Sequence, residues 1–308
     1  MDRPEITIAI CTYNRSDALE RCLGALAEQT CAKTRFDVLV VDNASTDDTP
    51  AVARRFEQRS PAFRYVYEPV QGLARARNRA LSQCESDILG FTDDDAIPNR
   101  DWVDSILETF RRLPEVYAAI GGEIEPLWEH ERPQWLDDEM LRALSARLGW
   151  DTRERELKSV EWICEVNCAY RTKVLSRYGG FPENLGRKGD LLLSGENYVN
   201  EHMRKDGCRF YFNPAVLVQH CIPKARTTQT WFKRRFFWQG LTGAACASVD
   251  RSLGRAPNYW GSLQLPGCAD DWRLLIEDNL SAPELQHACA MLSSMGYLLA
   301  LKDIINGR

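Results

Sequence analysis

The chain has 308 residues and a formal net charge of -5, with 44% hydrophobic and 27% charged residues. These proportions are typical of a soluble globular protein with a sizeable core, and the acidic balance disfavours a nucleic-acid partner. The chain opens without a signal-peptide pattern, and its longest late apolar run, residues 295–301, is too short to span a bilayer. We therefore expect a cytoplasmic protein that binds no nucleic acid.

The eleven cysteines are odd in number and include no C-x-x-C pair. Their pattern indicates neither a disulfide framework nor a zinc site. We expect most of them to be small buried residues in a protein from a reducing compartment.

Apolar runs alternate with amphipathic segments through the first third of the chain. The runs typical of buried strands occupy residues 6–10, 36–41, 63–67 and 88–91, and helical spacing of apolar residues follows each of them. Ser16 is the expected N-cap of the first helix, and Ser45 with Asp48 is spaced as a capping box for the second. This alternation predicts an α/β fold with a mostly parallel sheet flanked by helices.

Polar side chains follow three of these runs, where each predicted strand ends. They are Thr12, Tyr13, Asp42, Asn43, Asp93, Asp94 and Asp95. Ligands of open α/β sheets bind at the carboxyl ends of the strands, so we expect these side chains to line one pocket.

The three consecutive aspartates at 93–95 are the most unusual of these groups. Crowded carboxylates repel one another and raise one another's pKa, and a hard divalent cation with oxygen ligands relieves that repulsion. The alternative is a solvated acidic turn that caps the next helix.

The pattern is less regular after residue 115. The expected elements are a strand at 116–122, an irregular segment at 123–155, a strand or short helix at 160–170, a turn at 179–181 and a helix that ends at 206. Two short strands broken at Pro214 are expected between Phe210 and His220.

Seven short motifs occur together in the chain. They are residues 11–15 (CTYNR), 42–47 (DNASTD), 72–78 (GLARARN), 93–95 (DDD), 179–181 (GGF), 194–196 (SGE) and the run that ends at His220. In order and approximate spacing they resemble the family 2 inverting glycosyltransferases with the GT-A fold, over about residues 5–225. The resemblance implies a GT-A (Rossmann-like) domain at 1–225, with a nucleotide-sugar half at 1–122 and an acceptor half at 123–225, and a smaller, mainly helical C-terminal extension at 226–308.

The resemblance also implies a pocket for a nucleotide-sugar donor. Thr12 and Tyr13 would lie against the base, and Asp42 would hydrogen-bond uracil or a similar base. Asp93 would face the ribose, and Asp95 would ligate Mg²⁺ or Mn²⁺ at the diphosphate. The implied donor-binding set is Thr12, Tyr13, Arg15, Asp42, Asn43, Arg75, Asn78, Asp93, Asp94 and Asp95.

Narrower expectations attach to four of the motif residues. His220 stands where related enzymes place a metal ligand, although an isolated histidine is more often a structural hydrogen-bonding residue. Arg75 and Arg77 cannot both face a pocket from one helix, so one is expected to reach a phosphate and the other solvent. Asn78 is expected either to touch the donor or to fix a loop.

The catalytic base departs from the family pattern, in which the aspartate of a Glu-Asp pair is commonly taken as the base. Here Glu196 is followed by Asn197, whose amide has no useful basicity. We therefore assign the base to Glu196, with Asp190 as the alternative. On the structural interpretation, Glu196 only stabilises the start of the helix that follows.

Residues 231–238 combine aromatic and basic side chains. In one interpretation the aromatic rings pack against the core. In a second, Arg234 and Arg235 contact a donor or acceptor phosphate. In a third, the segment makes a peripheral contact with the inner face of the cell membrane, with Lys233 to Arg235 at anionic head groups.

The resemblance thus predicts a metal-dependent inverting transferase of hexosyl or N-acetylhexosaminyl groups. The donor would be a nucleotide sugar, with a UDP-sugar favoured, and the acceptor a saccharide, a lipid-linked sugar or another glycoconjugate of surface polysaccharide biosynthesis. One alternative is a non-catalytic nucleotide-sugar-binding or scaffold protein. A nucleotidyltransferase is less favoured, because no Gly-rich phosphate loop with a following Lys occurs near the N-terminus.

Overall fold

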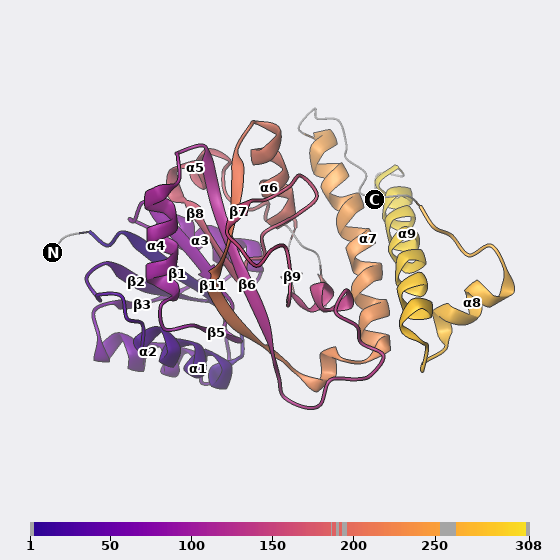
Figure 1. Cartoon of the computed structure of the whole chain (residues 1–308), viewed down its shortest axis with the longest axis horizontal. Helices are drawn as coiled ribbons and strands as arrows, with labels where there is room; N and C mark the ends of the chain where they lie inside the picture. Colours follow the sequence, from indigo (N-terminus) through magenta and orange to yellow (C-terminus); the bar gives the residue numbers. More distant parts are fainter. Residues whose placement is uncertain (1–2, 186, 189–190, 193–195, 253–262, 306–308) are drawn as a thin grey trace. The chain divides into compact units, whose positions relative to one another are not determined.

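The computed structural model describes residues 3–185, 187–188, 191–192, 196–252 and 263–305. The chain divides into two compact units whose segments alternate along the sequence. The first unit comprises residues 1–127, 145–183 and 196–221, and the second comprises 128–144, 184–195 and 222–308. Figure 1 traces both units by their element labels.

The first unit is built on a mixed sheet, in which nine strands are described (Figure 1). The strands are β1 (Ile6–Thr12), β2 (Phe36–Asp42), β3 (Phe63–Tyr67), β4 (Ile88–Thr92), β5 (Ala96–Pro98), β6 (Tyr117–Trp128), β7 (Arg155–Glu156), β8 (Asn167–Arg171) and β11 (Arg209–Ile222). Their order is β3-β2-β1-β4-β8-β6-β11-β5, and β7 also pairs with β11. The first four strands are parallel, whereas β8 runs antiparallel to β4 and β6. The predicted mixed α/β sheet is confirmed.

Helices connect these strands and bury their apolar faces. They are α1 (Ser16–Ala27), α2 (Thr49–Arg59), α3 (Leu73–Gln83), α4 (Trp102–Arg112), α5 (Thr172–Arg177) and α6 (Glu196–Lys205). The buried residues of α1 are those that its apolar spacing predicted, namely Leu19, Cys22, Leu23 and Leu26. Each fully buried leucine contributes roughly 2 kcal/mol, so this face fixes α1 in the unit.

The starts of α1 and α2 differ from the sequence prediction. Ser16 is the first helical residue of α1 and not its N-cap, and no capping box forms at α2. Asp47 serves both helix starts instead, because it accepts hydrogen bonds from the amides of Ser16 at 3.2 Å and Thr49 at 3.0 Å. Ser45 accepts from the amide of Asn14 at 2.9 Å. The first turn of α1 is thus capped by a residue from the loop before α2, and not by its own Ser16.

The strand predictions near Pro214 were also wrong, because β11 runs unbroken through this residue. The side chain of Asn213 accepts a hydrogen bond from the amide of Ala215 at 2.9 Å and bridges the proline locally. The antiparallel pairings of β11 with β7 and with β5 fall on either side of it, so the missing N–H of Pro214 breaks neither ladder.

The second unit is mainly helical, as predicted for the C-terminal part. Its elements are η1 (Met140–Leu144), β9 (Arg187–Lys188), β10 (Leu191–Leu192), η2 (Lys224–Arg226), α7 (Gln229–Ser252), α8 (Ala269–Ile276) and α9 (Ala282–Ile305). The long helices α7 and α9 lie side by side (Figure 1). Their backbones approach closely at Gly240, where a Cβ atom would overlap the carbonyl of Ser293. Among the described residues, no helix combines the length and the apolar character needed to cross a lipid bilayer.

Candidate active site

The carboxyl ends of β1, β2 and β4 meet at one edge of the sheet. Thr12, the last residue of β1, pairs with Asp42, the last residue of β2. Strand β4 lies on the other side of β1 and ends at Thr92, directly before the three aspartates. The parallel register therefore brings the predicted polar residues of three loops to the same edge.

Asp94 lies at the centre of a buried charge network. Thr12 Oγ1 donates a hydrogen bond to its Oδ2 at 2.7 Å, and Arg15 Nη1 lies 3.1 Å from its Oδ1. The same Arg15 nitrogen lies 2.5 Å from Asp95 Oδ2, so one guanidinium holds both carboxylates. Burial and the neighbouring Asp95 together raise the pKa of Asp94 to about 7, although Arg15 opposes the shift.

Asp93, Asp95 and His220 bring three potential metal ligands together. One ligand atom from each lies within 4.8 Å of the others. Strand β11 places the histidine, because His220 pairs with Ala96 in β5 and the amide of the next residue, Cys221, donates to the Asp95 carbonyl at 2.9 Å. This antiparallel pairing joins parts of the chain that are far apart in sequence.

The donor set of this cluster fits a divalent cation. His220 is buried, and its Nε2 lies 3.3 Å from Asp95 Oδ1. Neither ring nitrogen makes a well-formed hydrogen bond to a described residue, which is unusual for a buried polar group. Two carboxylates and an imidazole are suitable ligands for Mn²⁺.

Asp42 and Asn43 are both engaged within the protein. Tyr65, which the sequence prediction missed, donates its hydroxyl to Asp42 Oδ2 at 2.8 Å, and the Ser45 amide donates to Oδ1 at 2.9 Å. The Asn43 side chain accepts from the Gly72 amide at 2.8 Å and so holds the start of α3. Tyr13 is exposed at this edge, and contact of these residues with a donor remains a prediction.

Helix α3 positions a glycine turn through Asn78. Its side-chain amide donates to the Phe181 carbonyl and its oxygen accepts from the Phe181 amide, each at 2.8 Å. The predicted loop-fixing role of Asn78 is therefore present. Arg75 is partly exposed and lies 2.7 Å from Glu183, whereas Arg77 is buried with its guanidinium over the Phe181 ring. Arg75 is therefore the arginine that faces solvent, and a contact between Arg77 and a phosphate remains a prediction.

The catalytic base and the phosphate contacts of α7 both stay predictions. Helix α6 begins at Glu196, but the Glu196 side chain and Asp190 lie outside the described residues, so the choice of base stays a prediction. On α7, Arg234 is exposed and Arg235 half-buried, and their phosphate contacts are likewise untested.

The packing interpretation holds for part of the aromatic segment on α7. Phe232 is fully buried, and its ring packs edge-on against Trp135 and Trp231. Lys233 is also buried and donates to the carbonyl of Glu277. The expectation that Lys233 meets anionic head groups is therefore wrong, because its ammonium group is held inside the second unit.

Asn167 links several elements next to the aspartate-rich edge of the sheet, and the sequence analysis assigned it no role. Its Oδ1 accepts from Trp102 Nε1 at 2.8 Å, and its Nδ2 donates to the carbonyls of Glu123 and Val216, each at 2.7 Å. Asn167 also pairs with Thr92. No local sequence signal could have found this residue, because its partners come from α4, β6 and β11.

Comparison with known proteins identifies the family. Residues 7–179, more than half of the chain, match the family model described as Glycosyl transferase family 2. This chain belongs to glycosyl transferase family 2. The chain is therefore a glycosyltransferase, which removes the nucleotidyltransferase and scaffold alternatives.

Known glycosyltransferases resemble this chain over most of its length. The chain is 23% identical over 286 residues to a glucosyl-dolichyl phosphate glucuronosyltransferase of Haloferax volcanii, covering 89% of this chain and 88% of that protein. The mannosyltransferase PcManGT from Pyrobaculum calidifontis, solved in complex with GDP-Man and Mn²⁺, has a TM-score of 0.59 at 22% identity, covering 100% of this chain and 77% of that one. Residues 1–349 of S. aureus TarS in complex with UDP give a TM-score of 0.54 at 16% identity, covering 99% and 92%. The predicted GT-A fold is confirmed.

Proposed function

We propose that this family 2 glycosyltransferase is a metal-dependent inverting enzyme of glycoconjugate biosynthesis. It transfers a sugar from a nucleoside-diphosphate sugar, with a UDP-sugar favoured, to an acceptor hydroxyl. The observation that carries this proposal is the cluster of Asp93, Asp95 and His220 at the same sheet edge as Asp42. The nucleotides and the Mn²⁺ named for the structural neighbours support it.

Asp95 and His220 would hold the divalent cation, with Asp93 beside them. Because the set includes an imidazole, Mn²⁺ is favoured over Mg²⁺, which prefers oxygen ligands and retains water. When bound, the cation would supply positive charge next to the diphosphate leaving group.

Protein groups hold the carboxylates of the proposed cation site in place. Arg15 and Thr12 restrict the carboxylates of Asp94 and Asp95, and a preorganised site costs less reorganisation on binding. Asp42 is oriented by Tyr65 and would accept a hydrogen bond from a ring N–H of the base. Uracil and guanine both present such a group, so base choice requires a direct test.

Inversion requires a single displacement, in which the acceptor oxygen attacks the anomeric carbon opposite the departing diphosphate. One carboxylate base suffices to take the acceptor proton, and no covalent intermediate is needed. We assign this base to Glu196 at the start of α6, since Asn197 has no basicity.

A diphosphate-release assay with UDP-sugars and GDP-sugars tests the proposal. Wild-type protein should turn over a donor with Mn²⁺, and EDTA, Asp95→Ala and Glu196→Gln should each remove most of the rate. The stereochemistry of the product at the anomeric carbon, read by NMR, tests inversion. Donor binding without turnover under all conditions, or rates unchanged by EDTA, would contradict the proposed mechanism.

A further inference from the structure

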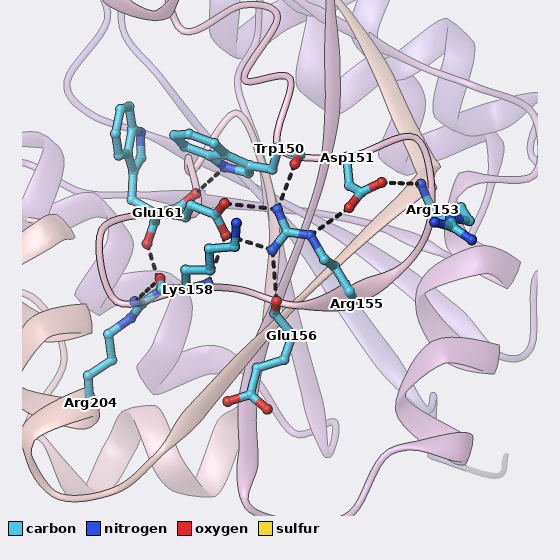
Figure 2. Close-up of polar contacts among 9 residues, drawn as sticks. Trp150, Asp151, Arg153, Arg155, Glu156, Lys158, Glu161 and Arg204 are labelled. Carbon is cyan, nitrogen blue, oxygen red and sulfur yellow. Dashed lines mark hydrogen bonds and ion pairs between the residues drawn. The ribbon is translucent and has the colours of Figure 1, made fainter.

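Residues 150–161 are ordered around Arg155, where the sequence predicted the end of an irregular segment at 123–155 and the start of a strand or short helix at 160–170 (Figure 2). The guanidinium donates to the two carboxylate oxygens of Glu161 at 2.7 and 2.8 Å, to Asp151 at 2.8 Å and to the carbonyl of Trp150 at 2.6 Å. Arg204 of α6 donates to the Glu161 carbonyl at 2.7 Å. Together these charge-assisted hydrogen bonds restrain the backbone around Arg155.

This rigid segment presents apolar side chains to solvent. Val160 is 79% and Trp162 36% exposed, on either side of the buried Glu161. The rings of Trp150 and Trp162 are nearly perpendicular, with centroids 4.7 Å apart, and Trp150 Nε1 donates to the Trp162 carbonyl at 2.9 Å. Exposed aromatic rings on a rigid support are typical of recognition surfaces, because they offer contact area at a low entropy cost.

A carboxylate lies near the backbone that leads into Trp150. The Ile124 amide donates a hydrogen bond to the Glu123 carboxylate at 2.9 Å, and the amide of Gly149, the residue before Trp150, lies close enough to lower the pKa of Glu123. The Arg147 amide also donates to the Ile124 carbonyl at 2.6 Å, which holds this stretch against β6. Partial burial raises the pKa of Glu123. Glu123 therefore offers a hydrogen-bond acceptor near the start of the segment that carries Trp150.

The same residues lie close to the aspartate-rich edge. Asn167 donates to the Glu123 carbonyl and pairs with Thr92, which directly precedes Asp93. Trp162 is five residues before Asn167, and five extended residues span at most about 17 Å. Trp162 thus lies within about 17 Å of Asn167, the residue that pairs with Thr92 beside the proposed donor site.

We propose that Trp150, Trp162 and Glu123 form a subsite for a pyranose ring of a saccharide acceptor. The apolar C–H face of a pyranose carries slight positive charge and stacks on the electron-rich face of an indole ring. The Glu123 carboxylate accepts a hydrogen bond from a ring hydroxyl. This inference rests on the proposed function, and it names the acceptor class of that site as a saccharide.

Saturation-transfer NMR with methyl glucopyranoside, galactopyranoside, mannopyranoside and N-acetylglucosaminide tests the subsite. Signals on the sugar C–H protons are expected with wild-type protein, and Trp162→Ala should weaken binding about threefold to tenfold, the value of one aromatic contact. Trp162→Phe should recover part of the loss, and Glu123→Gln should weaken binding through the hydroxyl contact. Trp272→Ala, which removes an exposed tryptophan of α8 in the second unit, is the matched control and should bind like wild type.

The outcomes separate this inference from the proposed function. If no methyl pyranoside binds, or if Trp162→Ala and Trp272→Ala bind equally well, the saccharide subsite is wrong. Signals that depend on Trp162 with n-octyl phosphate but with no pyranoside would identify a lipid-phosphate site and also overturn it. Donor turnover by wild-type protein, measured without any pyranoside, tests the proposed function alone.

Discussion

Two adjacent glycines allow the tightest test of the contact between α3 and the glycine turn. Gly179 and Gly180 both have a φ of +76°, a conformation that is strained for any residue with a Cβ atom. A Cβ on Gly179 would meet no other atom within 4 Å, whereas a Cβ on Gly180 would overlap the side-chain oxygen of Asn78. Alanine at the two positions therefore differs only in the clash.

The magnitudes follow from these two environments. Gly179→Ala should cost about 1 kcal/mol, the penalty for a left-handed alanine. Gly180→Ala should cost about 2–4 kcal/mol, because overpacking against Asn78 adds about 1–3 kcal/mol to the same penalty. Asn78→Ala should cost about 2–4 kcal/mol through the two lost hydrogen bonds to Phe181.

Urea denaturation of the three single variants and of Asn78→Ala/Gly180→Ala measures these free energies of unfolding. The double variant should be less destabilised than the sum of its parts, because removal of the Asn78 side chain also removes the clash. Equal losses for Gly179→Ala and Gly180→Ala, or full additivity in the double variant, would refute the close approach of Asn78 to the turn.

Three further variants test other parts of the molecule. Arg155→Met should lower the free energy of unfolding by about 2–4 kcal/mol, against less than about 0.5 kcal/mol for the exposed Arg153→Met, in urea titrations. Because Arg155 lowers the pKa of Glu161, the stabilisation that Arg155 provides is present at neutral pH and is lost as the pH falls through the folded pKa of Glu161. The free energies of unfolding of wild type and Arg155→Met should therefore become similar in acid. His220→Ala should weaken Mn²⁺ binding about tenfold or more by calorimetry, and unchanged affinity would exclude it as a ligand. Trp231→Ala/Arg235→Ala should reduce liposome flotation if α7 touches membrane, and equal flotation would discard that contact.

The sequence by itself determined the alternating core and the loops that follow it. Apolar periodicity is a local property, so β1 to β4 and the buried face of α1 could be predicted from their own residues. The parallel order of these strands then placed Thr12, Asp42 and the aspartates at one edge. Their motifs were also sufficient to indicate the family.

The tertiary structure decided what depends on residues distant in sequence. His220 joins Asp95 only because β11 pairs with β5, and its burial without a well-formed hydrogen bond to a described residue is visible only in three dimensions. Helix geometry could say that Arg75 and Arg77 diverge, but only the packing of Phe181 decides which one is buried. Such contacts carry no local periodicity, because each is set by the pairing of separate strands and helices.

The segment between β6 and β8 makes the same point most clearly. The sequence predicted irregular structure at 123–155 and a strand or short helix at 160–170, which does not describe the order found around Arg155. Around Trp150 and Trp162 the order comes from the Arg155 guanidinium, which hydrogen-bonds groups on several sides, and from Arg204 of α6, without any repeating backbone pattern. Periodicity identifies elements that bury a face, whereas a polar centre such as Arg155 can be identified only after the chain has folded around it.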